Sequence, residues 1–412
     1  MSTTDRELRV GMVGYAFMGA AHSQAWRTVN RVFDLPTRAR MSLICGRDTG
    51  KVADAADRLG WDAYTTDWRD LIARDDIDVV DVCTPGDSHA EIALAALAAG
   101  KHVLCEKPLA NTVSEARAMA AAAVTAQAAG VRSMCGFNYR RVPAVAMMRQ
   151  LVADGRLGVI RHVRATYLQD WIVDPQFPLV WRLQRDRAGS GALGDIGAHI
   201  IDLTQYVTGR RITGVSAVTE TFVRERPLPA GSSGLAATVD GAAADGLGPD
   251  GHRPATGAVT VDDAAVFVAR LDGGVLATYE ASRFATGRKN ALRVEINGSL
   301  GTVAFDLERL NELEFYDATR PAAEQGFSRI LVTEGEHPYM SAWWPPGHLI
   351  GYEHSFTHQM RDFVEAVATG VDPAPSFVDG LQVQLVLDAV TRSAELGSSW
   401  TEVEPALATV AA

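Results

Sequence analysis

In the first third of the sequence, short apolar runs alternate with longer segments whose apolar residues recur at helical spacing. Runs rich in valine, isoleucine, leucine and methionine are typical of buried strands, whereas apolar positions three or four residues apart indicate amphipathic helices. The predicted strands are 9–14, 41–45, a short one near Ala63, 79–83, 102–105 and 131–137, and the predicted helices are 20–29, 49–59, 67–73, 89–99 and 113–129. This alternation indicates a parallel sheet with right-handed crossovers, so we predict an α/β domain over residues 1–137.

The remainder of the chain, residues 138–412, follows a different pattern. After a predicted helix over 143–153, apolar and polar residues alternate in the segments 160–169, 212–222, 256–271, 275–282, 292–296 and 301–306. Such alternation is typical of a large, mainly antiparallel sheet with one packed face and one open face, and we predict an α+β domain. Two further helices are predicted over 352–368 and 379–395, and we expect the first to pack back near the N-terminal domain. The stretch 227–257 is rich in Gly, Ala, Ser and Pro without periodicity, which predicts a mobile loop.

Composition narrows the class of protein. The 412 residues are 47% hydrophobic and 22% charged, as in an ordinary globular protein, and the length favours two domains. A net charge of −11 without a basic cluster argues against nucleic acid or an anionic membrane as a partner. Residues 1–10 lack the apolar core of a signal peptide and no apolar run approaches a membrane span, so we expect a cytoplasmic protein. The cysteines are too far apart for a CxxC motif, and we expect buried free thiols at Cys45, Cys83, Cys105 and Cys135.

A glycine-rich turn follows the first predicted strand. Gly14, Ala16 and Gly19 have the spacing of the dinucleotide-binding fingerprint, in its proper context of strand, tight turn and helix. In that arrangement a pyrophosphate binds free backbone amides at the helix N-terminus, to which Phe17 and Met18 belong. Ala16 replaces the usual second glycine, which weakens the motif taken alone. We predict a Rossmann-type domain that binds NAD or NADP.

The end of the second strand bears on the choice between these cofactors. A carboxylate there binds the ribose diol of NAD, whereas a small residue followed by arginine suits the 2′-phosphate of NADP. Gly46 and Arg47 favour NADP. NAD remains the alternative, because a small shift of the loop would bring the carboxylate of Asp48 to the ribose diol.

Further residues at the carboxyl ends of strands are expected in the same cleft. Thr84, Pro85 and His89 follow the strand 79–83 and should line the nicotinamide side of the cofactor. The stretch GKHVLCEKPLA ends the strand 102–105 by presenting Glu106 and Lys107. An isolated EKP tripeptide is typical of a solvated surface turn, but a lysine at this edge is placed to meet a substrate.

Four motifs in order carry a resemblance that covers nearly the whole chain. GxAxxG is followed by TPxxxxH at 84–89, by GKHVLCEKPLA and by GSGALGDIGAHIIDL at 189–203, and this order resembles the Gfo/Idh/MocA family of sugar and cyclitol dehydrogenases. The segments FNYRR, YLQDW, SRFATGRKN and WWPPGH resemble members of that family that act on the anhydrosugar levoglucosan. Gly86, where many members carry asparagine, and Ala16 depart from the family pattern and affect cofactor choice more than fold.

The resemblance implies that Lys107, Asp195 and His199 are the catalytic residues. Asp195 and His199 lie four residues apart, so both project from one face of a predicted helix. A lone pair of this kind is more often a helix-end aspartate with a core histidine, but the glycines before it allow close approach of a ligand. A histidine titrates near neutrality and is the natural base for an alcohol proton, while a lysine stabilises a developing alkoxide. Which of Lys107 and His199 takes the proton stays open.

Polar and aromatic residues near predicted strand ends are candidates to hold a polyhydroxylated ring, beside Asp195 and His199. They are Tyr139, Arg140, Gln169 and Trp171, with Trp181 and Arg182 expected at the cofactor. For each of them an ordinary core or surface role is the alternative. His354 and His358 imitate a metal-binding helix but have no HExxH order and no third ligand in view, so we predict no metal site.

The function implied by the resemblance is an NAD(P)-dependent dehydrogenase that oxidises a secondary hydroxyl of a neutral sugar, an anhydrosugar or an inositol. Two alternatives are a glycosidase or lyase that oxidises its sugar transiently with bound NAD, and a catalytically silent nucleotide sensor. Members similar to this chain form dimers or tetramers through the open face of the C-terminal sheet, so a homo-oligomer, such as a homotetramer, is expected.

Overall fold

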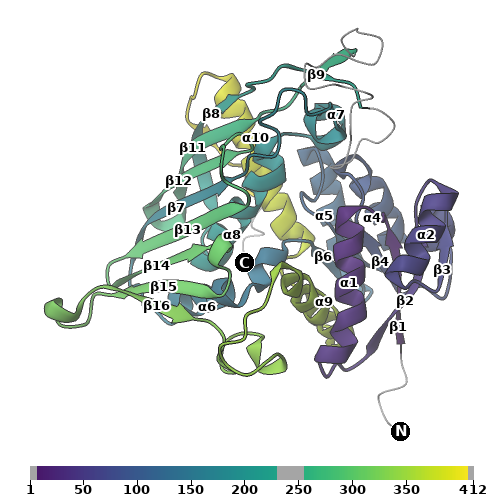
Figure 1. Ribbon diagram of the computed structural model, residues 1–412, viewed down its shortest axis with the longest axis horizontal. Helices are drawn as coiled ribbons and strands as arrows, with labels where there is room; N and C mark the ends of the chain where they lie inside the picture. The colour runs from purple at the N-terminus through teal and green to yellow at the C-terminus, as the bar shows by residue number, and fades with distance from the viewer. Residues whose placement is uncertain (1–6, 230–254, 407–412) are drawn as a thin grey trace.

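The computed structural model describes residues 7–229 and 255–406 (Figure 1). Two sheets lie at opposite sides of the molecule, and helices fill the space between them (Figure 1). Of the predicted mobile loop, residues 230–254 lie outside the described residues. Within the described ranges, no helix combines the length and apolarity needed to cross a membrane.

The N-terminal half contains a six-stranded parallel sheet of Rossmann topology, in the order β3-β2-β1-β4-β5-β6. Its strands are β1 Glu7–Val13, β2 Arg38–Cys45, β3 Ala63–Thr65, β4 Val79–Val82, β5 His102–Cys105 and β6 Ser133–Cys135. The helices between them are α1 Phe17–Val32, α2 Thr49–Leu59, α3 Trp68–Ile72, α4 His89–Ala98 and α5 Val113–Ala128. The predicted fold class is confirmed. Strand order reverses between β1 and β4, the point at which such sheets bind ligands.

The C-terminal half contains a nine-stranded sheet in the order β16-β15-β14-β13-β7-β12-β11-β8-β17. All neighbours in it are antiparallel except β7 and β12. Its strands are β7 Ile160–Leu168, β8 Ile212–Glu220, β11 Ala264–Leu271, β12 Val275–Ser282, β13 Ala291–Gly298, β14 Gly301–Asp306, β15 Glu312–Asp317, β16 Phe327–Leu331 and β17 Thr401–Glu402. The mainly antiparallel sheet is as predicted.

The single strand predicted over 256–271 is wrong, because the structure has two. β10 Thr256–Ala258 pairs with β9 Glu225–Pro227 as a separate ribbon, and β11 begins only at Ala264. Two acidic side chains hold the intervening segment out of the ladder. Asp262 accepts the amides of a loop near residue 191, and Asp263 accepts the amide of Phe222 at 2.8 Å. β15 and β16 were not predicted, although Leu313 and Phe315 of β15 are buried on either side of the exposed Glu314; β16 is short and has no buried residue.

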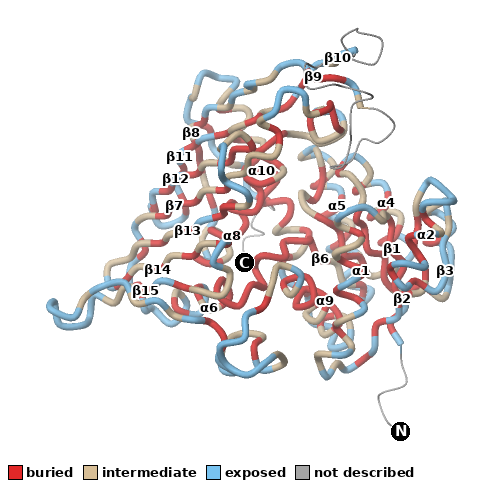
Figure 2. Tube along the Cα trace, in the orientation of Figure 1, coloured by how far each residue is buried: buried red, intermediate tan, exposed pale blue. Residues whose placement is uncertain are grey.

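Helices cover only one face of the large sheet. α6 Pro143–Ala153, α8 Ala198–Thr208 and α10 Phe377–Glu395 lie between it and the Rossmann half (Figure 1). Among the residues described, no helix lies against the other face, and β11 alternates buried and exposed residues along its length (Figure 2). The expected open face is therefore present in the chain.

A helix from the C-terminal half completes the core of the N-terminal half. α9, Tyr352–Thr369, lies beside α1 (Figure 1), where its Phe356 and Phe363 join one buried apolar cluster with Trp26 and Val29. Burying large apolar side chains from both halves in one cluster resists their separation. This packing fixes the orientation of the Rossmann sheet relative to the rest of the chain.

Candidate active site

The turn after β1 has the geometry that close approach of a phosphate requires. Gly14 adopts φ 106°, and a side chain there would lie 2.7 Å from the carbonyl oxygen of Cys83. A side chain at Gly19 would lie 2.2 Å from the carbonyl oxygen of Gly14, so α1 packs on the turn only with glycine at that position. Ala16 precedes α1 in an extended conformation that its methyl group tolerates, and its side chain does not cap the helix. The first amides of α1, from Phe17 onward, are thus available to a ligand.

The end of β2 offers less to a ribose than the sequence suggested. Gly46 packs against Tyr15, whose ring a side chain at Gly46 would overlap at 2.0 Å. Asp48 caps α2, since its Oδ1 accepts the amide of Lys51 at 3.0 Å, and this bond lowers the pKa of Asp48. Asp48 therefore already has a structural role, whereas Arg47 is exposed.

The turn after β4 is held by the histidine that was predicted at the cofactor. His89 is buried, with Nδ1 3.0 Å from the carbonyl oxygen of Pro108 and Nε2 2.9 Å from that of Thr84. Both ring nitrogens are thus engaged by backbone, so His89 joins the ends of β4 and β5 and has no nitrogen left for a ligand. Thr84 and Pro85 are half-buried at the edge of the sheet.

The three predicted catalytic residues come together in space. Lys107 Nζ donates to the backbone carbonyl oxygen of Asp195 at 2.6 Å and lies 3.3 Å from Asp195 Oδ1. Burial alone would raise the pKa of Asp195, but the charges of Lys107, Arg182 and Arg283 outweigh it and hold that pKa well below its usual range. Arg283 Nη1 lies 3.6 Å from Asp195 Oδ2. Asp195 is therefore an anion surrounded by cations.

Asp195 lies in one turn of π-helix, Leu193–Gly197, which leads directly into α8. Such turns often occur at functional sites because they change the direction of a side chain or carbonyl. Asp262 fixes the start of this segment, with its two carboxylate oxygens accepting the amides of Gly191 and Leu193, each at 2.7 Å. A side chain at Gly191 would lie 1.7 Å from the carbonyl oxygen of Asp262, so only glycine fits there.

His199 follows at the start of α8 and is buried among rings. Its ring centroid lies 4.6 Å from that of Tyr139 and 5.9 Å from that of Tyr167. Burial and, to a smaller extent, the nearby Lys107 lower the pKa of His199 well below its ordinary value, and the opposing effect of Asp195 is smaller. Its Nδ1 is buried without a hydrogen-bond partner among the described residues. The imidazole is thus neutral at neutral pH and able to accept a proton.

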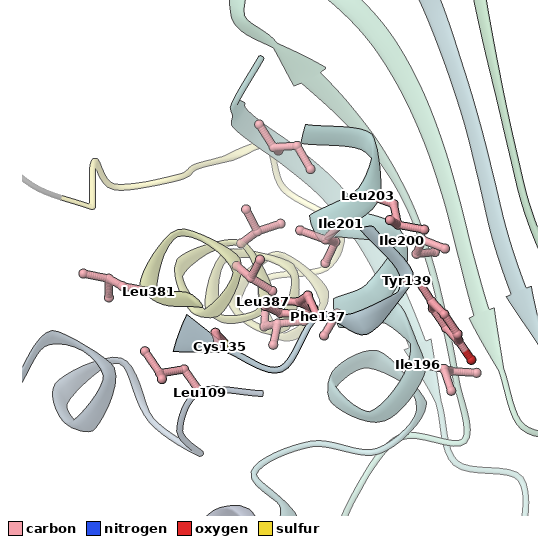
Figure 3. Packing of buried hydrophobic residues seen from close by; sticks show 14 of the residues in the cluster. Leu109, Cys135, Phe137, Tyr139, Ile196, Ile200, Ile201, Leu203, Leu381 and Leu387 are labelled. Atoms are coloured by element: carbon pink, nitrogen blue, oxygen red, sulfur yellow. The ribbon is translucent and has the colours of Figure 1, made fainter. Parts of the chain in front are cut away.

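A hydrogen-bonded chain of polar groups runs beside His199. The hydroxyl groups of Tyr139 and Tyr167 are 2.9 Å apart, and the Tyr167 hydroxyl donates to Asn290 Oδ1 at 2.8 Å. Gln169 Nε2 donates to the same oxygen at 2.7 Å. Figure 3 shows Tyr139 between α8 and the large sheet, on the side where Ile196 lies. Two predicted substrate residues, Tyr139 and Gln169, are therefore linked beside His199 through residues that were not predicted.

Arg140, which was predicted to bind the substrate, pairs with a buried carboxylate instead. Its Nε lies 2.8 Å and its Nη2 2.5 Å from the carboxylate oxygens of Asp202, and all but 7% of the residue is buried. This bidentate pair satisfies the arginine inside the protein, so we do not include it in the substrate site.

The predicted aromatic residues lie on the arginine side of Asp195. Trp171 is 5.5 Å from the guanidinium carbon of Arg283, and the guanidinium carbon of Arg182 is 4.3 Å from the ring of Trp181. Burial lowers the pKa of Arg182, and Asp195 opposes this shift. Arg283 is fully buried, yet its Nε and Nη1 have no hydrogen-bond partner among the described residues. A buried donor without a partner calls for an explanation, and a ligand that accepts its hydrogen bond is one.

Sequence reasoning missed four residues that shape this site: Tyr167, Asp262, Arg283 and Asn290. Arg283 and Asn290 lie in the SRFATGRKN segment that carried part of the family resemblance, which was the available signal. Tyr167 begins the YLQDW segment. Nothing in its sequence context distinguished Asp262 from other acidic residues.

Both parts of the chain match known protein families. Residues 8–134 match the model of an oxidoreductase family with an NAD-binding Rossmann fold, and residues 145–304 match the GFO/IDH/MocA C-terminal domain. Levoglucosan dehydrogenase of Pseudarthrobacter phenanthrenivorans is 42% identical over 400 residues, which is 97% of this chain and 98% of that protein.

Two solved structures resemble the chain over nearly its full length. An oxidoreductase domain protein from Kribbella flavida is 60% identical with a TM-score of 0.89, covering 97% of this chain and 99% of that one. A levoglucosan dehydrogenase in complex with NADH and levoglucosan is 40% identical with a TM-score of 0.88, covering 97% of this chain and 100% of that one.

We expect His199 of the folded protein to stay unprotonated at pH values at which an ordinary histidine takes up a proton. Its folded pKa lies below the value of about 6.5 in the unfolded chain, so the unfolded state binds more protons as the pH falls through that value. His199 therefore lowers the free energy of unfolding progressively below about pH 6.5. NMR titration of the ring Cε1–H measures this, with the His199 signal assigned by its loss in His199→Phe. A folded-state resonance that titrates at or above the value seen in urea would contradict the prediction.

Proposed function

This chain belongs to the Gfo/Idh/MocA family of oxidoreductases, and on that premise we propose that it is an NAD-dependent dehydrogenase of a neutral sugar, a levoglucosan-like anhydrosugar or an inositol. In the proposed reaction, one secondary hydroxyl of the substrate becomes a ketone. The observation that carries the proposal is the meeting of Lys107, Asp195 and a neutral His199 beside the carboxyl edge of a Rossmann sheet.

The cofactor site proposed is the turn after β1. The glycines at 14 and 19 leave room for a pyrophosphate, and the uncapped first amides of α1 would bind its oxygens. Thr84, Pro85 and Glu106 lie at the ends of β4 and β5, where the nicotinamide end would reach. When bound, the cofactor supplies the hydride acceptor of the reaction.

Each of the three residues has a proposed role that follows from its surroundings. His199 takes the alcohol proton, because its imidazole is neutral, whereas Lys107 Nζ donates to both oxygens that Asp195 offers it. Lys107 stabilises the negative charge that develops on the substrate oxygen. Asp195, kept ionised by its cationic neighbours, accepts a hydrogen bond from an adjacent hydroxyl and orients the ring. Gln169, Asn290 and the ring of Trp171 complete the proposed sugar site.

The burial and pairing of the cationic side chains favour a neutral substrate. Lys107, Arg182 and Arg283 outnumber Asp195, which taken alone would favour an anion. Arg283 has no exposed surface, and Lys107 is held by Asp195, so neither presents a free charge to a phosphate group. Two of the relatives named above are levoglucosan dehydrogenases, and levoglucosan is a neutral anhydrosugar.

For the cofactor we propose NAD, and NADP is the alternative. NADH is the ligand in the levoglucosan dehydrogenase structure that resembles this chain. NADP is tested as well for two reasons. Arg47 is exposed beside Gly46, where it could bind a 2′-phosphate, and the Asp48 carboxylate that would bind a ribose diol already caps α2.

The test is the absorbance of the reduced nicotinamide, followed with NAD and with NADP against levoglucosan, glucose, xylose, inositols and glucose 6-phosphate. We expect reduction with a neutral sugar or cyclitol and with NAD in preference to NADP. Reduction only with glucose 6-phosphate would overturn the neutral substrate. Bound cofactor without net reduction, together with release of an aglycone from a glycoside, would favour a glycosidase that oxidises its sugar transiently.

Replacing the catalytic lysine separates chemistry from cofactor binding. We expect Lys107→Ala to lower kcat by about a hundredfold or more, because the charge that stabilises the alkoxide is removed. NADH binding, followed by fluorescence, is expected to survive. Lys101→Ala, at the opposite end of β5, is the matched control and should keep full activity. Loss of NADH binding in Lys107→Ala would mean that this lysine serves the nucleotide rather than the substrate.

We also propose that the open face of the large sheet joins copies of this chain into a dimer or tetramer. Val218, Val266, Val268 and Leu276 are between 42% and 59% exposed there, and the two residues Val218 and Val266 are direct neighbours across β8 and β11. Exposed apolar residues that gather on one face are typical of an interface.

Charges on this face should therefore dissociate the oligomer. We expect the double substitution Val266→Glu and Val268→Glu to shift the protein to a monomer, because carboxylates would be buried without partners at the interface. Light scattering after gel filtration measures the mass. Val371→Glu is the control, because this valine is 65% exposed and lies outside the sheet. A wild-type monomer, or an unchanged mass of the double variant, would contradict the proposal.

A further inference from the structure

A buried histidine that no motif predicted lies between two acidic residues beneath the candidate site. His22 Nδ1 is 3.0 Å from both carboxylate oxygens of Asp81, and His22 Nε2 is 3.0 Å from Glu106 Oε1. His22 and Asp81 are fully buried, and Glu106 is 4% exposed. The three side chains form a linear chain from Asp81 through His22 to Glu106.

The two ionised acceptors on either side of the ring favour a state in which both ring nitrogens donate. A carboxylate oxygen accepts, so a nitrogen on each side of the ring carries a proton only if the imidazole is an imidazolium. Burial opposes that charge, but Asp81 and the hydrogen bonds outweigh it and raise the pKa of His22 well above its ordinary value. Asp81 also accepts from Trp26 Nε1 at 2.8 Å, and Glu106 Oε2 accepts the amide of Lys107 at 3.3 Å. The buried charges therefore have partners on every side.

His22, Asp81 and Cys83 lie close enough to ligate a metal ion, but in this structure their atoms already bond to one another. Cys83 Sγ lies 3.2 Å from His22 Nδ1 and 3.5 Å from Asp81 Oδ1, so the potential ligands form hydrogen bonds with each other. Burial and Asp81 raise the pKa of the Cys83 thiol, which keeps it protonated. Bonds of about 2.0 to 2.3 Å to a tetrahedral zinc would place the ligand atoms about 3.3 to 3.8 Å apart, farther than the histidine and carboxylate are here.

The hydrogen-bonded series Asp81–His22–Glu106 joins three elements of the Rossmann domain. His22 belongs to α1, the helix whose N-terminus offers amides to the pyrophosphate, Asp81 belongs to β4, and Glu106 ends β5. Glu106 is bonded to the imidazole on one side and to the amide of Lys107 on the other. Without the imidazolium, two carboxylates would remain buried without a cation, and Glu106 would turn away or take up a proton. Either change would alter the hydrogen bond between Glu106 and the backbone amide of Lys107.

We propose that His22 is a positioning residue, which as an imidazolium holds the carboxylate of Glu106 and thereby fixes where Lys107 presents its ammonium group. The part of this proposal that concerns turnover rests on the proposed dehydrogenase function. His22 acts through Glu106 and touches neither sugar nor cofactor. The cross-link also ties the helix that would bind the cofactor to the strand that carries the lysine.

The kinetic test compares His22→Ala with Trp26→Phe, a control that disturbs the same helix and the same Asp81 but leaves the link to Glu106. We expect His22→Ala to lower kcat for the sugar by about tenfold to a hundredfold, the size of effect that misplacing a catalytic group produces. The Kd for NADH should change little, and Trp26→Phe should keep kcat even at a similar loss of Tm. Equal losses of kcat in the two variants would overturn the proposal, because they would show general destabilisation.

A double-mutant cycle keeps the proposal testable if His22→Ala folds poorly. Glu106→Gln conserves size, and it is expected to lower kcat to a similar degree. His22→Ala and Glu106→Gln combined should be no worse than the more severe single change, because both act through one link. Multiplicative losses would overturn the proposal.

A measurement without turnover separates this inference from the proposed function. The ring ¹⁵N shifts of His22 in the intact wild-type protein are expected to be those of an imidazolium at neutral pH, and to move in Glu106→Gln. Neutral-imidazole shifts, or a metal that co-purifies and broadens them, would overturn the proposal. If no sugar is oxidised while the imidazolium is observed, the dehydrogenase function fails and the protonated His22 link stands.

Discussion

The contact between Lys107 and Asp195 is the interaction on which the candidate active site depends. Lys107 ends a strand of the Rossmann sheet, and Asp195 lies in the π-turn before α8 in the other half of the chain. A hydrogen bond of 2.6 Å between them exists only if the two halves keep one orientation. α9 packs on α1 and α10 packs on α5, and these apolar contacts hold that orientation, so the chemistry depends on packing far from the reacting atoms.

Buried charge is arranged in two ways around this contact. Some buried charges have a full partner inside the protein, as in the bidentate pair of Arg140 and Asp202. At the cleft the compensation is incomplete, because Nδ1 of His199 and two nitrogens of Arg283 have no hydrogen-bond partner among the described residues. An unsatisfied buried polar atom is costly and is retained where it serves a ligand or a reaction. Such atoms also occur elsewhere among the described residues, at Arg132, Arg141, Arg226, Asp263, Gln359 and Gln384, so they are consistent with the site but do not locate it by themselves.

Local sequence predicted most of the fold because strand and helix periodicity is set by near neighbours along the chain. β5 and α2 begin and end where the apolar pattern indicated. The prediction failed where a distant partner decides the path of the chain. Between β10 and β11, the carboxylates of Asp262 and Asp263 accept amides from segments near residues 191 and 222, and this ends the ladder. No local pattern shows that, since the partners lie about 40 to 70 residues away along the chain.

The sequence by itself indicated an α/β part, an α+β part with a large sheet, and the glycine turn for a dinucleotide. Each of these follows from spacing or from the sterics of single residues, which act locally. The tertiary structure alone decided which partner each charged side chain has. In the folded protein Arg140 pairs with Asp202, His89 contacts two backbone carbonyl oxygens, and His22 lies between two carboxylates. The strength of an ion pair depends on distance and burial, and both are set only when segments far apart in sequence pack together.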